Sequence, residues 1–141
     1  MHGHSALKNR LTMDIKDFMK NDRFAANAGI ELMEVGEGRA KARMTVTKEH
    51  LNAGGVCQGG ALFTLADLAC AAVANSHGQL TFSITANITF VRSAKEGETI
   101  YAVATEVVNH SRVPYIIVEI QNEKGDLLAA FTSSGYRKGG G

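Results

Sequence analysis

Neither sign of charge is in excess in this sequence. Its 141 residues contain 15 Lys and Arg against 14 Asp and Glu, which gives a formal net charge of +1. A protein whose main partner is nucleic acid needs a basic excess or a basic stripe to hold the phosphates. The balance therefore excludes nucleic acid as the main partner, although it allows a small basic site for one anionic ligand.

Long apolar runs and cysteine motifs are also missing. No stretch of about 18 apolar residues is present, so no transmembrane helix is expected. The polar residues 1–10 lack the apolar segment of a signal peptide. Cys57 and Cys70 form no CxxC motif and have no His pair nearby, which argues against a zinc site and a disulfide scaffold. We expect a cytoplasmic protein without a bound metal.

The length suits one domain with its own hydrophobic core. The sequence shows no internal repeat and no linker. We therefore predict a single domain over residues 1–141. Its ends, about 1–13 with His2 and His4, and 138–141, are expected to be flexible.

Two kinds of helix are predicted. Residues 14–22 have apolar residues at helical spacing, with Asp14 as N-cap, and 24–30 continue as a short helix or turn. After a glycine-rich loop at 48–60, residues 61–78 are rich in Ala and Leu and apolar nearly all round. This segment predicts a long buried helix that ends at 75–78.

The rest of the chain has the pattern of β-strands. Residues 39–47 alternate charged and apolar side chains, so that Ala40, Ala42, Met44 and Val46 share one face. Strands are predicted at 30–35, 39–47, 81–92, 98–109, 113–122 and 127–137, with turns at 36–38, 94–98, 109–112 and 122–126. Successive strands with short turns favour an antiparallel sheet. Curled around the apolar helix, this sheet gives an α+β fold.

Asp67 stands out because its neighbours Leu65, Ala66, Leu68 and Ala69 are apolar. An ionised carboxylate in such a setting costs several kcal/mol unless it is paired or solvated, and a raised pKa often accompanies a functional role. The alternative is that Asp67 faces solvent at a rim or caps a neighbouring loop.

The Gly59-Gly60 pair lies where the loop enters the long helix. The N–H groups of a first helical turn have no partner within the helix, and a glycine there has no Cβ to keep a substrate oxygen away. Such N–H groups can stabilise the oxyanion that forms when a carbonyl is attacked. The glycines could instead serve only a tight turn or close packing. Gly59 and Asp67 are separated by roughly 12 Å along one helix at 1.5 Å per residue. If the pair is catalytic, two antiparallel copies of the helix must share the active site.

Other candidates are weaker. Cys57 could be a nucleophile with His50, His77 or His110 as base, but no cysteine-hydrolase signature surrounds it, and a buried structural thiol fits better. Arg92 and the turn Asn109, His110, Ser111 and Arg112 could hold phosphates, or could be ordinary polar turns.

Residues 51–71, LNAGGVCQGGALFTLADLACA, resemble the signature of the phenylacetic-acid-degradation type of hotdog thioesterases. That signature has Asn and Gly, then His-Gly-Gly, then Leu-x-Asp inside the central helix. The likeness covers about residues 20–137, and Asn52, Gly59, Gly60 and Asp67 match in spacing. Further matching stretches are 25–46, 83–98 and 125–137.

The resemblance implies a hotdog fold, with a curved antiparallel sheet around the central helix, and homodimers with a continuous sheet that pair into tetramers. It also implies a set of roles. Asp67 would attack the thioester or activate water, the Gly59 N–H would polarise the carbonyl, Asn52 would position the water or carboxylate, and Ser83 would assist. Coenzyme A, as part of the substrate rather than a cofactor, would lie along the groove between subunits, near Gly60, Phe90, Arg92 and the 109–112 turn.

Three functions are considered for a chain with these residues. The first is hydrolysis of an acyl- or aryl-acyl-CoA, and the second is a non-catalytic acyl-CoA-binding module, which would gain nothing from a carboxylate near an anionic ligand. The third is a hotdog dehydratase, which needs a catalytic His where this sequence has Gln58. The acyl group is not determined, since the pocket depends on side chains such as Phe24, Met33, Phe63 and Phe82.

Gln58 replaces the His that usually precedes the first glycine of the signature. Glutamine keeps a hydrogen-bond donor but does not titrate. We therefore predict that the rate profile shows no histidine-like limb near pH 6–7, as measured by thioester hydrolysis over pH 5 to 9. Two results would contradict this: a limb in the wild type that disappears in Gln58→His, or an inactive wild type that Gln58→His makes active.

Overall fold

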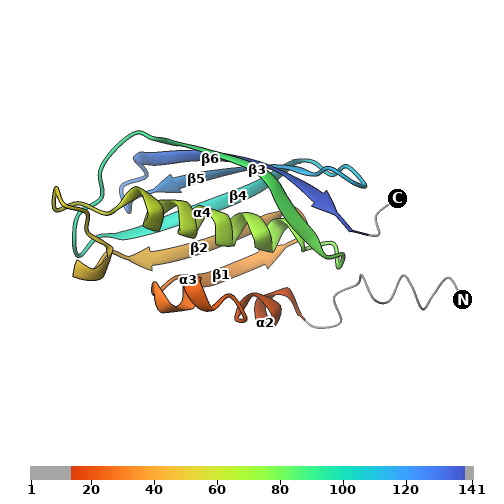
Figure 1. Cartoon of the computed structure of the whole chain (residues 1–141), viewed down its shortest axis with the longest axis horizontal. Helices are drawn as coiled ribbons and strands as arrows, with labels where there is room; N and C mark the ends of the chain where they lie inside the picture. Colours follow the sequence, from red (N-terminus) through yellow and green to blue (C-terminus); the bar gives the residue numbers. More distant parts are fainter. Residues whose placement is uncertain (1–13, 139–141) are drawn as a thin grey trace, which may run out of the picture.

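A computed structural model describes residues 14–138, and these residues form a sheet wrapped around one long helix (Figure 1). The expectations for residues 1–13 and 139–141 lie outside the described residues. Lys138, predicted to be in a flexible end, donates its backbone N–H to Leu80 O at 3.0 Å. The elements are α2 (Ile15–Met19), α3 (Arg23–Asn27), β1 (Glu31–Gly36), β2 (Arg39–Thr45), the 3-10 turn η1 (Lys48–His50), α4 (Gly59–Ala74), β3 (Thr81–Phe90), β4 (Thr99–Val108), β5 (Tyr115–Gln121) and β6 (Leu127–Arg137).

The sheet has six strands in the order β1-β2-β4-β5-β6-β3, and every pair is antiparallel. All six predicted strands are confirmed, with ends shifted by up to two residues. The alternation in β2 is also confirmed, because Ala40, Ala42 and Met44 are buried while the charged residues between them face outward. The curved antiparallel sheet around a central helix is the predicted hotdog fold.

Helix α4 is buried along most of its surface but not all of it. Leu62, Leu65, Ala66, Ala69 and Val73 are almost fully covered by the sheet. Most of the residues that remain at least partly exposed lie on one side of the helix, in a stripe that we call the open face of α4: Gly59, Gly60, Thr64, Asp67 and Ala71. The predicted long buried helix is confirmed for most of the surface of α4, and this stripe is the part that the sheet leaves open.

Both N-terminal segments predicted to be helical are present, 14–22 as α2 and 24–30 as α3, and each helix is shorter than predicted. The carboxylate of Asp14 accepts from Lys16 N at 2.8 Å, which confirms the predicted N-cap. The carboxylate of Asp22 accepts from Ala25 N at 3.0 Å and starts α3. An Asp that caps a new helix cannot also continue the previous one, because the cap residue has non-helical backbone angles.

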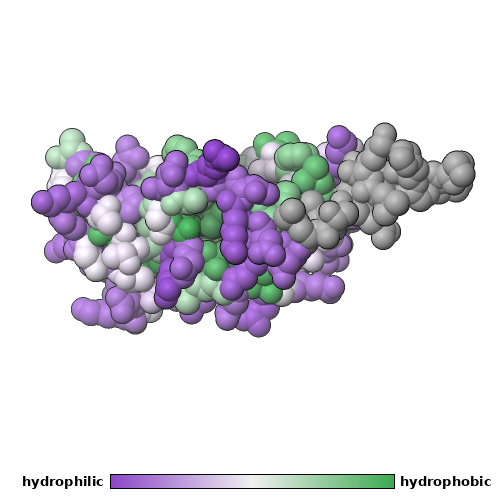
Figure 2. Space-filling view, turned by 90° about the horizontal axis from the view of Figure 1, so that it is seen from below, coloured by the Kyte–Doolittle hydropathy of each residue, from purple (hydrophilic) through white to green (hydrophobic). Residues whose placement is uncertain are grey.

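The face that carries α2 and α3 is largely hydrophilic, with smaller hydrophobic areas between the polar side chains (Figure 2). Among residues 14–138, no helix has the length and apolar character needed to span a bilayer.

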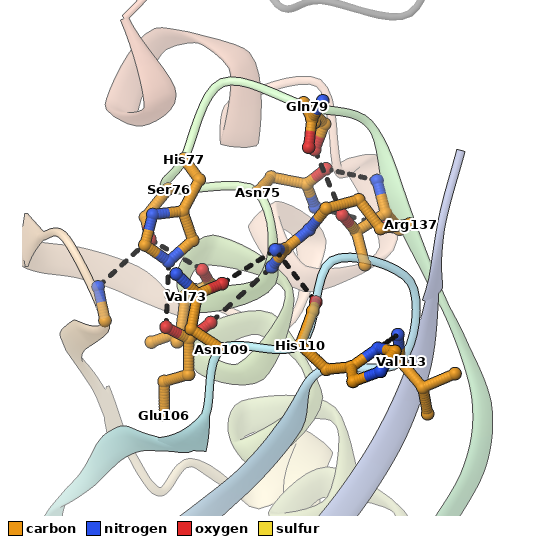
Figure 3. Close-up of polar contacts among 12 residues, drawn as sticks. Val73, Asn75, Ser76, His77, Gln79, Glu106, Asn109, His110, Val113 and Arg137 are labelled. Atoms are coloured by element: carbon orange, nitrogen blue, oxygen red, sulfur yellow. Dashed lines mark hydrogen bonds and ion pairs between the residues drawn. The ribbon is translucent and has the colours of Figure 1, made fainter. Parts of the chain in front are cut away.

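A buried polar cluster joins the C-terminal end of α4 to the ends of β4 and β6 (Figure 3). Arg137 Nη2 lies 3.5 Å from Glu106 Oε2, and His77 Nε2 lies 2.8 Å from Glu106 Oε1. The side chains of Arg137 and Glu106 are only 4% and 6% exposed. Arg137 Nη1 also donates to Asn109 Oδ1 at 2.7 Å and to His110 O at 3.2 Å, so one guanidinium fixes the 109–112 turn.

We expect Arg137→Ala to lower the free energy of unfolding by about 3 kcal/mol, because it leaves the buried Glu106 carboxylate without its cation. The double variant Glu106→Gln with Arg137→Met removes both charges and should regain at least half of this loss. Urea unfolding of the three proteins measures both effects. A double variant no more stable than Arg137→Ala would show that the unpaired charge is not the cause.

Candidate active site

The loop before α4 is a small hairpin whose base adjoins the helix. Gln58 N donates to His50 O at 2.7 Å, and Asn52 N donates to Val56 O at 2.8 Å. The Asn52 side-chain oxygen accepts from Gly54 N at 2.9 Å and from Val56 N at 3.2 Å. These two bonds use the side-chain oxygen of Asn52, so its Nδ2 group is the part that could face a ligand. We call residues 50–58 the oxyanion loop, because it leads directly to the candidate donor at Gly59.

Gly59 is the first residue of α4, and its N–H belongs to the first helical turn, where backbone donors have no partner within the helix. The ring of Phe90 lies against this glycine: a Cβ at position 59 would be 2.7 Å from Phe90 Cζ. The Gln58 side chain lies over Gly60 in the same way, since a Cβ there would be 2.6 Å from Gln58 Oε1. The structure thus brings together Gln58, Gly59, Gly60 and Phe90.

A broad cavity of about 1020 Å³ opens beside this helix end. Gln58, Gly60 and Thr64 form its edge on the side of α4. Its apolar lining comes from α3, β2, the oxyanion loop and α4: Phe24, Ala28, Met44, Leu51 and Ala61.

Asp67 lies farther along the open face of α4, beside a second and smaller cavity of about 190 Å³. Ser83 at the start of β3 and Ser133 of β6 line the same cavity, and Ser133 Oγ donates to Ser83 Oγ at 3.2 Å. The pKa of the Asp67 carboxyl is raised above its ordinary value, mainly because burial disfavours the charged form and further because of the negative charge of Asp22. Asp67 therefore holds its proton more tightly than an exposed Asp.

The two groups are separate within one chain. Gly59 and Asp67 are eight positions apart on α4, which corresponds to roughly 12 Å. A reacting carbonyl must lie about 3 Å from both the attacking group and the oxyanion donor. One chain thus presents two halves of a site on the same helix face, and the shared active site stays a prediction.

The predicted coenzyme A residues are divided as well. The 109–112 turn is fixed by Arg137, which pairs with Thr81 at the start of β3, whereas Phe90 and Arg92 lie at the other end of that strand. Phe90 is nine positions after Thr81 along the strand, roughly 30 Å at 3.3 Å per residue. A single chain therefore does not bring Arg92 near the exposed Asn109, His110, Ser111 and Arg112. His110 Nδ1 accepts from Arg112 N and Val113 N at 3.0 Å, which shapes the turn.

The cysteine alternative gains no support from the geometry. Cys57 is buried, and burial raises the pKa of its thiol; that of Cys70 is raised to about 12. Each histidine considered as its base is already engaged: His50 with Ala28 O, His77 with Glu106, and His110 with its own turn.

The aromatic side chains expected to shape the pocket have different positions. Phe24 lines the large cavity and Phe82 the small one. Phe63 packs edge-on against Phe131 with ring centroids 5.2 Å apart, so it belongs to the core. Met33 is a half-buried residue of β1 and is not among the residues that line either cavity.

Two residues near the site were missed at the level of sequence. Ser133 holds Ser83, but the strand pairing that brings them together leaves no local signal. The sequence suggests His50 only as a base for Cys57; in the structure it takes the capping position three residues after Thr47 that Glu or Gln usually fills, so its residue type gave no capping signal. His50 lies in the wall of the large cavity.

Comparison with known proteins agrees with this fold. The thioesterase superfamily profile matches residues 54–129. The chain is 40% identical over 134 residues to a protein of Archaeoglobus fulgidus that is inferred to be an esterase, covering 94% of this chain and 87% of that protein. It is 35% identical over 121 residues to the acyl-coenzyme A thioesterase PaaI of Escherichia coli, covering 86% of each.

The solved structure of the Escherichia coli PaaI protein from the phenylacetic acid degradation operon superposes with a TM-score of 0.86. The superposition covers 97% of this chain and 96% of that chain at 33% identity. The family resemblance and the fold predicted from the sequence are confirmed.

The raised pKa of Asp67 predicts that Asp67→Asn is more stable than the wild type at neutral pH. Below the pKa of an unfolded Asp, both proteins are uncharged at this position and should be equally stable. As the pH rises from there to the higher folded pKa, the wild type should lose stability relative to the variant, and the difference should then stay constant. Urea unfolding from pH 4 to 8 at one protomer concentration measures this difference. A wild type more stable than Asp67→Asn at pH 7 would contradict it.

Proposed function

Because the chain belongs to the thioesterase superfamily and is a thioester hydrolase, we propose that it converts an acyl- or aryl-acyl-CoA to the free acid and coenzyme A. The similarity to an acyl-coenzyme A thioesterase over 86% of the chain supports this substrate class. The observation that carries the proposal is the open face of α4, with an oxyanion donor at one end and a carboxylate of raised pKa near its middle.

A homodimer would complete the site. β3 is an edge strand of ten residues that exposes large apolar side chains, with Phe82 55%, Ile84 63% and Phe90 53% exposed. A long apolar edge is a template for pairing with another strand. We propose that β3 pairs antiparallel with β3 of a second copy and that the two open faces of α4 meet, so that Asp67 of one protomer faces Gly59 of its partner.

The same pairing would unite the divided coenzyme A residues. In an antiparallel pair, the Phe90 end of one β3 lies next to the Thr81 end of the other. Phe90 and Arg92 of one protomer would then approach the partner's 109–112 turn, which Arg137 holds beside Thr81. The phosphates of coenzyme A would lie in this groove, near the guanidinium groups of Arg92 and Arg112.

Thioester hydrolysis in this shared site would need one carboxylate and a set of hydrogen-bond donors. Asp67 either attacks the thioester carbonyl or removes a proton from an attacking water, and its raised pKa makes it the stronger base. The Gly59 N–H, with Asn52 and Gln58, would hold the developing oxyanion. Collapse of the tetrahedral intermediate breaks the C–S bond and releases the thiolate of coenzyme A, which takes up the proton that comes from the attacking water or from solvent. Where Asp67 is the nucleophile, this collapse leaves a mixed anhydride on its carboxylate, which water then hydrolyses to the free acid; Ser83 would orient the water. No metal or redox cofactor takes part in this proposal.

The acyl group would occupy the large cavity. Gln58 and Gly60 stand at its edge, so an acyl chain whose carbonyl is held at Gly59 can continue between Phe24, Met44 and Leu51. A cavity of about 1020 Å³ lies at the upper end of ordinary ligand-site volumes, so it admits aryl and medium-chain groups alike.

Pairing of dimers into a tetramer has a candidate surface on the outer face of the sheet. The outward residues of three neighbouring strands carry one charge, Glu119. The others are uncharged: Thr85, Asn87, Thr89, Tyr115, Ile117, Ala130, Thr132 and Ser134. Depletion of charge is typical of the centre of a protein–protein interface.

We expect the wild type to hydrolyse members of a panel of acyl-CoA esters and Asp67→Asn to lose about 100-fold or more in turnover, as removal of a catalytic carboxylate requires. The panel should run from acetyl-CoA to long-chain and aryl-acyl-CoA, with release of the free thiol as the readout. Binding of acyl-CoA without hydrolysis, or equal rates for both proteins, would favour a non-catalytic binding module.

Complementation tests whether the site is shared. Gly59→Pro removes the N–H at the first helical position, where Pro is tolerated, and Gln58 already has the extended backbone, φ −67° and ψ 143°, that a following Pro requires. Gly59→Ala, which keeps the N–H but also presses on Phe90, is the matched control.

Equal mixing of Asp67→Asn and Gly59→Pro protomers makes half of the dimers mixed, and each mixed dimer has one intact site, so about a quarter of wild-type activity should return. Two inactive variants that stay inactive after mixing, with mixed dimers verified by mass, would contradict the shared site.

A further inference from the structure

His50 forms polar contacts through both ring nitrogens and through its backbone oxygen. Its ring Nδ1 lies 2.9 Å from Thr47 N, its ring Nε2 lies 2.6 Å from Ala28 O, and its backbone oxygen accepts from Gln58 N at 2.7 Å. Only 9% of the residue is exposed. One side chain therefore connects the end of α3, the start of η1 and the residue that precedes the candidate oxyanion donor.

The partners fix the form of the imidazole. Thr47 N is a donor, so Nδ1 must accept and carries no proton. The proton is then on Nε2, which donates to the Ala28 carbonyl. Both nitrogens are used by protein groups, so His50 does not supply acid–base chemistry to a substrate.

The two contacts reach two different parts of the lining of the large cavity. Ala28 follows α3, and with Phe24 it forms one wall. Gln58 and Gly60 form the edge where the thioester carbonyl would be held. The ring of His50 is bonded to the wall and its backbone to the edge, so the residue sets the separation of the two.

We propose that His50 is a positioning residue for the reaction, which holds the acyl-binding wall of α3 at a fixed place relative to the oxyanion loop. This inference rests on the proposed thioesterase function. A displacement of about 1 Å at a reacting group can cost on the order of 100-fold in rate. The loss of rate on substitution of His50 should grow with the length of the acyl group. Only an acyl chain long enough to contact the α3 wall depends on the position that the hydrogen bond from Nε2 to Ala28 O gives to this wall.

Two substitutions separate the two ring contacts. Gln at position 50 can place its side-chain N–H₂ near the position of Nε2 and keep the bond to Ala28 O, whereas Asn can place its oxygen near Nδ1 and keep only the bond from Thr47 N. His50→Ala loses both. His77→Gln is the matched control, because His77 is also a bonded histidine but belongs to the cluster with Glu106 at the other end of α4.

We expect His50→Asn and His50→Ala to lose about 10-fold to 100-fold in kcat/KM for acyl groups that fill the cavity, and much less for acetyl-CoA. His50→Gln should recover most of the loss. The control should change thermal stability without changing the ratio of long-chain to acetyl rates. Kinetics over the acyl-CoA panel, with sizing and thermal unfolding of each variant, provide these values.

Several outcomes would overturn the inference. One is an equal loss for acetyl and long acyl groups, and another is an Asn variant that works as well as the Gln variant. A third is a His50→Ala protein with wild-type kinetics. If His50→Ala does not fold, the Gln and Asn pair still decides the matter. A wild type that hydrolyses no acyl-CoA would overturn the proposed function, and this inference with it. If the wild type is active but the His50 variants keep its ratio of long-chain to acetyl rates, only this inference is overturned.

Discussion

The sheet covers the apolar side chains of Leu65, Ala66 and Ala69 on α4 without removing any charge from water. Covering the carboxylate of Asp67 in the same way would carry a large desolvation penalty. The helix is therefore rotated so that Asp67 lies on the one stripe that the sheet leaves open. Because side chains three or four residues apart share a helix face, Gly60, Thr64 and Ala71 come to the surface with it. The carboxylate is still partly desolvated, which is why its pKa is raised.

This rotation also explains where the other polar groups lie. β3 forms the sheet edge on that side, so Ser83 meets Asp67 at one end of the strand and Phe90 meets Gly59 at the other. The two halves of the candidate site are thus spaced by the length of the helix and strand between them. Pairing of two such edges about a two-fold axis is the simplest operation that would close this spacing.

Most of the fold was readable from local patterns. The alternation in β2 and the glycine-containing turns at 38 and 125 gave strands and hairpins, because period and turn chemistry are properties of short segments. The end of α2 was predicted three residues too late, at Asp22 in place of Met19, since Asp22 can end one helix or cap the next, and only the bond to Ala25 N decides which.

The candidate site was less predictable than the fold. Asp67 and the glycines stood out by composition, whereas the predicted grouping of Arg92 with the 109–112 turn along a subunit groove stays a prediction, because the two lie apart within one chain. That grouping depends on β6 lying between β5 and β3, and strand order in a sheet is not encoded in any local stretch. The pairing of Ser83 with Ser133 and the bond from His50 to Ala28 are long-range contacts of the same kind.

Gln58 is where the chain departs from the family pattern, and the surrounding bonds suggest why the departure is tolerable on the proposed mechanism. Its backbone N–H is fixed by His50 O, and its side chain lies over Gly60, so its amide is available at a set place beside the first turn of α4. A group that only has to donate a hydrogen bond there need not titrate. The proton accepted from water then falls to Asp67, whose raised pKa suits that task better than an ordinary carboxylate. The nearby histidine, His50, has both ring nitrogens bound by protein and contributes geometry in place of a proton.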